Sequence, residues 1–516
     1  MRNRGWRWPA AASCFAIAAA FPSIAASPEA DERFHIYTFT ARFGANPWKI
    51  VRYAYDTVPD FLDRGNFRPL GRIVEWSGQV FVGELALLLN IPVNLSLGIL
   101  RLISVAVLAA SLLWLVSAVL DRPSEADASG VLLPASAVMV GASFLVSQTG
   151  GPVNLFAWLY LGTGAISVLA SRAFARADLY GGPVSRSSAV RFVLLGVLLA
   201  STNEVTAIAI PLSLVVIVAR SVVLGIPIGV GLLRLGAFRA WLFQLAGFLS
   251  VFAPVRIAIA SRCGGDVCYS ASDFALTSAY PEAIVGRMAT GFVPTQWSEG
   301  LSSDATADLV GRGGVALLLG FVVVVLPAVV IHVGGWGAIT AARPDSRSLL
   351  GLALLGFGLA AATTSLISLS QVVQDPSLRV GLAWRDSALA TPGMSLALAA
   401  GLTWFAHARP VRESIAPRLA VLGVGLLVLL VSFTTSWAVA HKTSEDAERV
   451  LNNRIALEAV VFRETPEANA YRCELLADWA ESYRDKNWDF RPDQLRGALT
   501  NFVNYAHQAP AFCVEG

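Results

Sequence analysis

Two adjacent acids, Asp31 and Glu32, follow the first apolar run of the chain and could take a proton from a hydroxyl group. A carboxylate at the edge of a bilayer, where the dielectric constant is reduced, can act as a general base. Adjacent acids are also common at helix starts and on surfaces, so a structural role stays open. The sequence therefore predicts Asp31 and Glu32 as catalytic candidates.

Basic residues follow in the same polar stretch. Arg68 and Arg72 lie four residues apart in NFRPLGRIVEW, a spacing that puts both on one face of a helix. Two guanidinium groups at a membrane surface suit a phosphate, although lipid headgroups in general would also satisfy them. We expect Arg68 and Arg72, together with His35, to bind substrate.

Two further charged residues are predicted at the outer ends of apolar spans. Glu204 lies in STNE and Arg385 in GLAWRD. A carboxylate at span depth is costly unless it has a partner, which makes Glu204 a candidate for the site. Both residues are substrate-binding candidates, and each could instead anchor its span at the membrane surface.

The composition of the whole chain indicates a membrane protein. Of its 516 residues, 55% are hydrophobic and only 15% are charged, and the mean hydropathy is +0.59. Soluble domains carry about 25% charged residues. We therefore predict an all-α, polytopic membrane protein, whose small net charge of +3 reflects topology and gives no reason to expect nucleic acid.

The apolar runs predict about eleven transmembrane helices, each of about 20 residues. Arginine-bearing short loops, such as the loop with Arg172 and Arg176, all fall on one side, which the positive-inside rule makes cytoplasmic. This predicts a cytoplasmic N-terminus and an extracytoplasmic C-terminus, and we expect the membrane to be a bacterial inner membrane. The first apolar run could alternatively be a cleaved signal peptide. The predicted parts are a transmembrane domain at 1–440, its long outer loops at 27–94 and 256–312, and a small helical tail at 441–516.

The polar end of the second span has two further expected features. Within the first outer loop, residues 79–90 are expected to form an interfacial helix before the second span. Arg101, near the start of that span, is expected to extend its guanidinium group to the outer surface.

The cysteines favour disulfides over metal binding. Cys263 and Cys268 lie in CGGDVC, and Cys473 and Cys513 bracket the tail. Both pairs fall on the predicted outer side, where disulfides persist, and their pairing would leave Cys14 free. CGGDVC could be half of a metal site, but no His or Cys cluster stands beside it, and we predict no metal ligands.

Three segments resemble the GT-C superfamily of integral-membrane glycosyltransferases, which includes protein O-mannosyltransferases and bacterial lipid-linked sugar transferases. ADERFHIYTFTARFG is similar to the Asp-Glu motif of the first outer loop, and NFRPLGRIVEW to a Tyr-Arg-Pro-Leu segment. STNEVTAIAIPLSLVVIVA is similar to a Lys-Glu or His-Glu segment, with Asn203 where many members have a basic residue. GLAWRDSALATPG is less closely similar to a Glu-Arg-Tyr segment late in the sequence of family members, with Asp386 in place of the tyrosine.

The resemblance implies an inverting transfer of a sugar from a polyprenyl-phosphate donor on the outer face of the membrane. By position, Asp31 becomes the base or the acid that orients the sugar, with Glu32 beside it. Arg68 becomes the contact for the donor phosphate, and Glu204 a supporting residue. The acceptor would be an envelope glycan, lipid or protein. A divalent cation stays open as a cofactor.

Other classes of function remain as alternatives. The chain has no Walker loop, Rossmann glycine motif, HExxH zinc helix or GxSxG elbow, which disfavours an ATP-driven pump and the familiar hydrolases. A transporter or flippase of envelope lipids or glycans would place charges in mid-span, whereas nearly all charges here lie at span ends. A non-catalytic assembly protein, with the tail as its binding module, is a third interpretation. A meeting of Asp31, Arg68 and Glu204 in one outward cavity would favour the enzyme.

Overall fold

The computed structural model describes most of the chain. The described residues are 6–28, 31–121, 131–148, 150–262, 275–298, 301, 325, 328–329, 344–374, 380–408, 416–445, 447–483 and 492–514.

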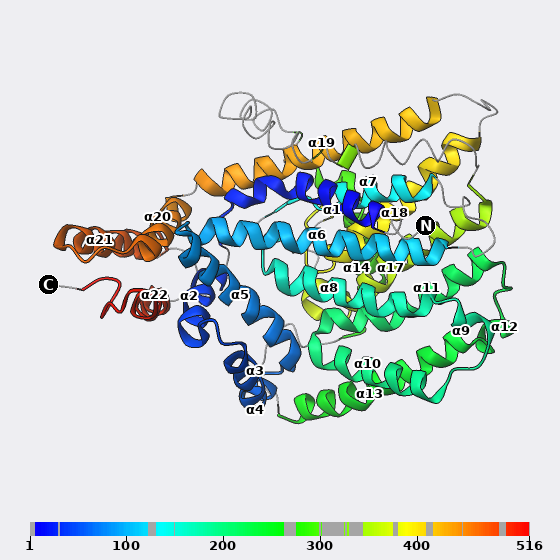
Figure 1. The fold of residues 1–516 in the computed structure, drawn as a ribbon, viewed down its shortest axis with the longest axis horizontal. Helices are drawn as coiled ribbons and strands as arrows, with labels where there is room; N and C mark the ends of the chain where they lie inside the picture. The colour runs from blue at the N-terminus through cyan, green and yellow to red at the C-terminus, as the bar shows by residue number, and fades with distance from the viewer. Residues whose placement is uncertain are drawn as a thin grey trace.

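The described structure is helical, and its long helices run side by side along the longest axis of the molecule (Figure 1). Apolar runs of this length form helices in a membrane, because a helix satisfies its own backbone hydrogen bonds. The elements of this bundle are α1 (Arg7–Ala20), η2 (Phe21–Ala25), α6 (Val93–Leu120), α7 (Leu132–Ala142), α8 (Ala157–Arg172), η3 (Ala173–Ala175), α9 (Asp178–Gly181), α10 (Arg186–Thr202), η4 (Glu204–Ile208), α11 (Ala209–Leu224), α12 (Val230–Leu233), α13 (Gly236–Arg262), α14 (Tyr280–Thr290), η7 (Val293–Gln296), α17 (Ser346–Ile367), η8 (Gln371–Gln374), α18 (Ser387–Ala408) and α19 (Ala416–Glu445).

A second group of helices covers one end of the bundle, which we term the cap end (Figure 1, left). Its elements are α2 (Glu32–Phe43), α3 (Pro47–Asp56), α4 (Val58–Leu62), α5 (Pro69–Leu89), α20 (Ala447–Val461), α21 (Pro466–Tyr483) and α22 (Pro492–His507).

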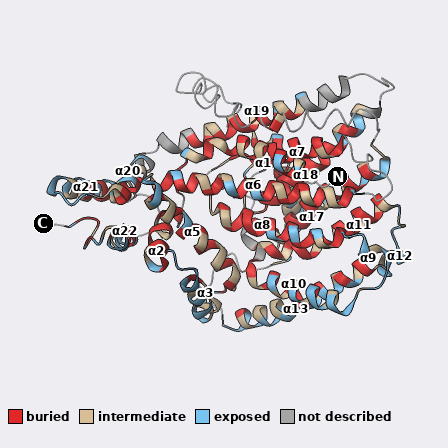
Figure 2. Cartoon of the chain, viewed as in Figure 1, coloured by how far each residue is buried: buried red, intermediate tan, exposed pale blue. Residues whose placement is uncertain are grey.

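Among the described residues, seven helices are long and apolar enough to cross a membrane, as expected of a multi-pass membrane protein. The predicted spans at 155–170 and 192–201 correspond to α8 and α10, which are 16 and 17 residues long. The predicted span at 315–333 lies almost entirely outside the described residues. The bundle core is fully buried and apolar (Figure 2), with Phe15, Leu112, Val216 and Leu355 among its residues.

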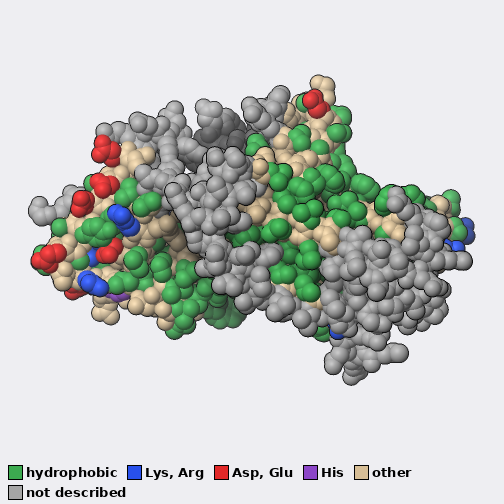
Figure 3. Space-filling view, turned by 90° about the horizontal axis from the view of Figure 1, so that it is seen from above, with side chains coloured by type: hydrophobic (Ala, Val, Ile, Leu, Met, Phe, Trp, Pro, Cys, Tyr) green, Lys and Arg blue, Asp and Glu red, His purple; other side chains and the backbone are tan. Residues whose placement is uncertain are grey.

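Charge is distributed along the long axis as a membrane protein requires. On the face in Figure 3, charged side chains gather toward the end that holds α20–α22, and hydrophobic side chains cover the middle. α9 and α12 lie at the opposite end of the bundle (Figure 1). The arginines next to these two helices, Arg176 and Arg234, are therefore remote from the cap end.

α5 is longer than the sequence indicated. The expected interfacial helix at 79–90 is the second half of one continuous 21-residue helix that begins at Pro69 and ends before Asn90 in a left-handed conformation. Polar residues in its first half hid the helical pattern. Gly71 brings this half against the end of α10, because a Cβ atom there would lie 2.0 Å from the Thr202 carbonyl oxygen.

The C-terminal tail is helical and packs on the bundle. Trp479 and Phe502 of the tail lie in the same hydrophobic cluster as Ile36 of α2, Val82 of α5 and Leu97 of α6. The Tyr505 hydroxyl group donates a hydrogen bond to Glu84 at 2.6 Å.

Other polar contacts fasten the tail to the bundle. Asn94 of α6 donates to Asn453 of α20, and Ser27 donates to the same Asn453 oxygen at 3.1 Å. Gly44, which ends α2 with a φ of +52°, leaves no room for a Cβ atom beside Tyr505. The tail thus contacts the C-terminal end of α2 and, at Ser27, the segment that follows η2.

The predicted disulfide between Cys473 and Cys513 is present, with 5.1 Å between the Cα atoms, and Cys14 is free as expected. Cys263 and Cys268 lie outside the described residues. The disulfide ties the end of the chain to α21.

We predict that replacing Cys473 and Cys513 by serine lowers the thermal unfolding temperature in detergent. A disulfide closing a loop of this size typically contributes about 2–4 kcal/mol by restricting the unfolded chain. Reductant should lower the unfolding temperature of the wild-type protein by more than that of the double variant, which keeps only Cys263 and Cys268 as a predicted pair. Cys14→Ser is the matched control and should behave as wild type. An unfolding temperature that does not respond to reductant in the wild type would contradict the prediction.

Candidate functional site

Three basic side chains surround one buried carboxylate at the cap end. Glu75 of α5 lies 3.6 Å from the Arg72 guanidinium group, and 3.8 Å from both Arg68 and the His35 ring. The Glu75 side chain is only 4% exposed, and those of Arg72, Arg68 and His35 are 10%, 18% and 20% exposed. Within the described part of the chain, Glu75 Oε2 accepts no hydrogen bond. We term these four residues the Glu75 cluster.

Helical spacing on α5 and the approach of α2 build this cluster. Pro69 starts α5, so Arg68, Arg72 and Glu75 lie on consecutive turns of one face. The Arg72 guanidinium group also lies 3.7 Å from the ring centroid of Phe61, which holds it by a cation–π contact. His35 comes from the second turn of α2, which packs against α5.

His35 lies among aromatic rings. Its ring centroid is 4.7 Å from that of Phe34, 5.1 Å from that of Phe39 and 6.1 Å from that of Phe156. Burial lowers the pKa of His35, and the carboxylates of Glu75 and Asp31 oppose this shift in part. The imidazole is therefore favoured in its neutral form, which can accept a proton or a hydrogen bond.

Asp31 and Glu32 occupy different environments. Asp31 is exposed at the start of α2, and its charge acts on His35. Glu32 is 2% exposed. One Glu32 oxygen accepts a hydrogen bond from the Phe156 backbone at 3.0 Å, and the other lies 3.8 Å from Arg101.

Arg101 is fully buried. The expectation that it reaches the outer surface is therefore wrong. Its guanidinium group donates to four backbone carbonyl oxygens, those of Ser23, Ala26, Ser27 and Asn154, at 2.6–3.2 Å. Internal acceptors are so plentiful here that the side chain has no need of water.

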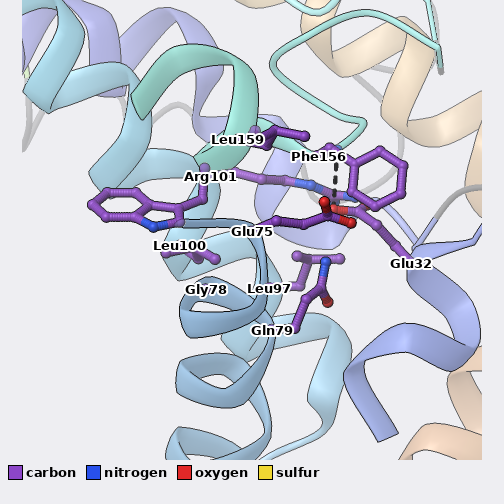
Figure 4. A pocket seen from close by; sticks show the side chains of 11 residues that line it. Glu32, Glu75, Gly78, Gln79, Leu97, Leu100, Arg101, Phe156 and Leu159 are labelled. Carbon is purple, nitrogen blue, oxygen red and sulfur yellow. Dashed lines mark hydrogen bonds and ion pairs between the residues drawn. The ribbon is translucent and has the colours of Figure 1, made fainter. Parts of the chain in front are cut away.

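A small pocket joins the Glu32–Arg101 pair to the Glu75 cluster. Glu32, Glu75, Gln79 and Arg101 line it together with the backbone turn at Phe156. Figure 4 shows the Glu32 and Glu75 carboxylates pointing into the pocket from α2 and α5. Its volume is about 10 Å³, which is room for about one water molecule. Two buried carboxylates thus share one polar space.

Arg385 approaches this region through aromatic side chains. Its guanidinium group is 5.3 Å from the ring centroid of Tyr160, which lies 6.4 Å from that of Phe156. Phe156 in turn contacts the His35 ring. Arg385 therefore lies near the same end of the bundle as the Glu75 cluster, two rings away from His35.

Glu204 is placed by its backbone alone. It is the first residue of η4, directly after Asn203, and its side chain lies outside the described part. Asn203 and Phe67 line the same groove. Asn203 precedes Glu204 in the chain, and Phe67 precedes Arg68, so the backbones of Glu204 and Arg68 both adjoin this groove.

That groove is mainly apolar. Phe248, Phe252, Val255 and Ile259 of α13 line it with Phe67 of the segment before α5 and with Asn203. Arg256 also contributes, and its guanidinium group lies 5.6 Å from the Phe252 ring centroid. The groove has a volume of about 30 Å³ and follows α13, most of whose surface is not covered by other helices.

Neither Glu75 nor the structural role of Arg101 was predicted from the sequence. Glu75 follows Arg72 by three residues, and this spacing was the available signal. Arg101 had no comparable signal, because its partners lie 53 to 78 residues away. Among the described residues, no three His, Cys, Asp or Glu side chains form a group that could hold a metal ion.

We predict that Arg101→Ala destabilises the protein more than Glu32→Gln. Removing Arg101 takes the cation away from the buried Glu32 carboxylate and leaves the carbonyl groups of Ala26, Ser27 and Asn154 without this donor, and breaking a buried pair costs about 3–5 kcal/mol. Glutamine at position 32 still accepts the Phe156 hydrogen bond. Thermal unfolding in detergent measures the order. Arg52→Ala, which removes an arginine paired with Asp56 on the surface, is the control and should cost at most about 1 kcal/mol. Equal unfolding temperatures for Arg101→Ala and wild type would contradict the role of Arg101.

Comparison with known proteins adds no assignment. No family model, no curated protein and no solved structure matches the chain. The likeness to the GT-C superfamily therefore rests on the sequence segments quoted above, and any functional argument rests on the site.

Proposed function

We propose that the protein is a multi-pass membrane glycosyltransferase that moves a sugar from a polyprenyl-phosphate donor to an acceptor in the cell envelope. The observation that supports this most is the Glu75 cluster, in which Arg68, Arg72 and His35 converge at one end of an apolar bundle. The residues that the resemblance names for the donor and the acceptor come from that same end. An envelope glycan, lipid or protein would be the acceptor.

The donor phosphate would lie beside Arg68 and Arg72. Guanidinium groups bind phosphate through two parallel hydrogen bonds, and positive charge stabilises a phosphate leaving group. The Glu75 carboxylate lies 3.6–3.8 Å from both guanidinium groups, so it attracts the two charges toward the same place. The apolar groove beside Phe67 would receive the start of the polyprenyl chain.

The acceptor would be activated by Asp31. Its exposure and its closeness to His35 favour it over Glu32, whose two oxygens already have Phe156 and Arg101 as partners. In the reaction, Asp31 takes the proton of the acceptor hydroxyl group, and the oxygen forms a bond to the anomeric carbon. The bond from that carbon to the phosphate oxygen breaks, and polyprenyl phosphate leaves with the electron pair. Attack from the opposite face inverts the anomeric carbon. Glu32 keeps the start of α2 in place.

The topology of this proposal has about eleven spans of about 20 residues each in a bacterial inner membrane. The cap end faces outward and the N-terminus inward. The placement of the basic segments at α9 and α12, opposite α20–α22, supports this orientation.

We predict that Asp31→Asn reduces sugar transfer by about 10²–10⁴-fold, the usual loss for a general base. Asparagine has nearly the same shape, so expression and donor binding should be largely retained. Transfer is measured with purified protein and a polyprenyl-phosphate sugar. Asp56→Asn removes another exposed acid of the same segment and is the control. Full transfer by an Asp31→Asn, Glu32→Gln double variant would remove the first outer segment from the chemistry.

We further predict that Arg68→Ala weakens donor binding by about tenfold or more, since hydrogen bonds to charged groups contribute about 1.5–3 kcal/mol. Arg68→Lys should restore only part of it, because lysine lacks the planar fork. Donor affinity is measured by titration of the purified protein. Arg52→Ala, at a guanidinium group on the outer surface of α3, should bind donor as wild type does. An unchanged affinity for Arg68→Ala would exclude this residue from the donor site.

A further inference from the structure

α3, at the cap end, has faces of different chemistry. Ile50 and Ala54 are buried and belong to the same hydrophobic cluster as Trp76 of α5. Trp48 and Tyr55 are seven residues apart, which is close to two helical turns, so both lie on one edge of the helix. Their exposed fractions are 77% and 52%. This edge of α3, which we term the aromatic edge, therefore presents two large rings that the fold leaves uncovered.

A charged face lies next to the aromatic edge. The Arg52 guanidinium group is 3.4 Å from the Asp56 carboxylate, one turn further along, and Lys49 is exposed on the same side. The start of the helix is fixed, because the Asn46 side chain accepts a hydrogen bond from the Trp48 amide at 3.0 Å. Apolar rings beside a charged face are typical of helices that lie in the plane of a membrane surface.

α13 carries an apolar stripe that leads toward α3. Most of the surface of α13, one of the helices long and apolar enough to cross a membrane, is not covered by other helices. Exposed apolar residues recur on it at every third or fourth position, which places them on one stripe. The stripe consists of Leu242, Ala246, Leu249, Ala253, Ile257 and Ala260. An uncovered apolar stripe of this length on such a helix faces the hydrocarbon chains of the bilayer.

The stripe ends where α4 contacts α13. Arg262, the last residue of α13, lies 3.4 Å from the carboxylate of Asp63, the residue that follows α4. α4 follows α3 after the single residue Thr57, and both short helices lie beside this end of α13 (Figure 1). The exposed pair of Arg262 and Asp63 marks the level at which the surface passes from apolar to charged, as it does at the edge of a bilayer. The aromatic edge of α3 is close to this level.

We propose that α3 is an interfacial helix, whose aromatic edge inserts among the lipid headgroups of the leaflet on the cap side. Trp and Tyr side chains favour this region, because their rings are apolar and their N–H or O–H groups bond to headgroups and water. The charged face stays on the water side. The bilayer is favoured over a protein partner as the occupant, because the aromatic edge adjoins the end of a stripe that already faces lipid.

The proposal does not depend on the proposed function, but it sets the depth of the groove beside Phe67. Val255, Arg256 and Ile259 line this groove from the last two turns of α13. With α3 among the headgroups, the groove lies at the boundary between headgroups and hydrocarbon chains. A lipid-borne substrate then reaches the groove without leaving the bilayer.

Spin labels on single cysteines test the environment of each face in the full-length protein, reconstituted in phosphatidylcholine nanodiscs. Trp48→Cys and Tyr55→Cys report on the aromatic edge, and Lys49→Cys reports on the charged face. The background keeps the Cys473–Cys513 disulfide and has serine at the other three cysteines, Cys14, Cys263 and Cys268. The measured quantity is the collision rate with oxygen, which concentrates in lipid, divided by that with a water-soluble nickel chelate. This ratio should be severalfold higher at positions 48 and 55 than at position 49.

Two control positions calibrate the scale. Ile257→Cys lies on the α13 stripe and should give the highest ratio, whereas Tyr471→Cys replaces an exposed aromatic residue of α21 in the tail and should give the lowest. Labels at positions 48 and 55 should fall between these two. Ratios equal to that of Tyr471→Cys would show that the aromatic edge faces water and would overturn the proposal. Low collision rates with both reagents would show that a second copy or another protein covers the edge, which would overturn it as well.

A measurement without labels guards against disturbance by the cysteine variants. Wild type and Trp48→Phe are compared in vesicles of phosphatidylcholine brominated near the headgroup or deep in the acyl chains, because bromine quenches tryptophan at short range. Bromine near the headgroup should quench a larger part of the emission in wild type than in Trp48→Phe, and deep bromine should distinguish the two proteins less. Equal quenching of both proteins near the headgroup would contradict the insertion of Trp48. Phenylalanine at this exposed position should leave the unfolding temperature in detergent close to that of wild type.

Discussion

The organisation of the cap end depends on one guanidinium group that has no access to water. Arg101 donates to the last carbonyl groups of the first span and its exit turn, and to the carbonyl group that precedes α8. Three of these carbonyl groups, those of Ala26, Ser27 and Asn154, belong to buried backbone outside the helices, and without a donor each would cost free energy. Because Arg101 satisfies them together, three segments are held at one point. The carboxylate of Glu32 then balances its charge and sets where α2 begins.

The candidate site follows from this anchor. Once the start of α2 is fixed, His35 faces α5 one turn later, and the charged face of α5 lies opposite. The Glu75 carboxylate lies 3.6–3.8 Å from the guanidinium groups of the two arginines on that face, which favours their charged form. The cap end thus combines a frame built from buried ion pairs with a cluster that contains buried polar atoms. Within the described part of the chain, Glu75 Oε2 and His35 Nδ1 have no hydrogen-bond partner. This combination is typical of sites that bind a ligand.

The sequence predicted those features that depend on local pattern. Hydropathy gave the helical, multi-pass character, and the sidedness of the cysteines gave the Cys473–Cys513 pair. It placed His35, Arg68 and Arg72 in one segment, and they lie together.

Features that depend on distant partners were not predictable in the same way. Asp31 and Glu32 are neighbours in sequence, but successive residues of a helix point about 100° apart, so one reaches water and the other a buried arginine. Arg101 is buried because its carbonyl partners lie far along the chain. Asp386 is likewise buried against Arg287, which is 99 residues away. The Gln79–Asn90 segment was separated from its own helix because buried polar residues interrupt the apolar pattern of α5.

The shared hydrophobic core of α2, α5, α6 and the tail has a consequence for biogenesis. Ser27 and Asn453 are bonded across 426 positions, and Glu84 and Tyr505 across 421. During synthesis, α2 and α5 leave the ribosome long before α20–α22 are made. The apolar faces of α2 and α5 that pack against these later helices therefore stay uncovered while the intervening spans are inserted. The segment that carries Asp31 and His35 reaches its final packing only when the tail arrives and its disulfide closes. A partly synthesised chain therefore lacks this packing, and the synthesis of α20–α22 completes the core that surrounds α2 and α5.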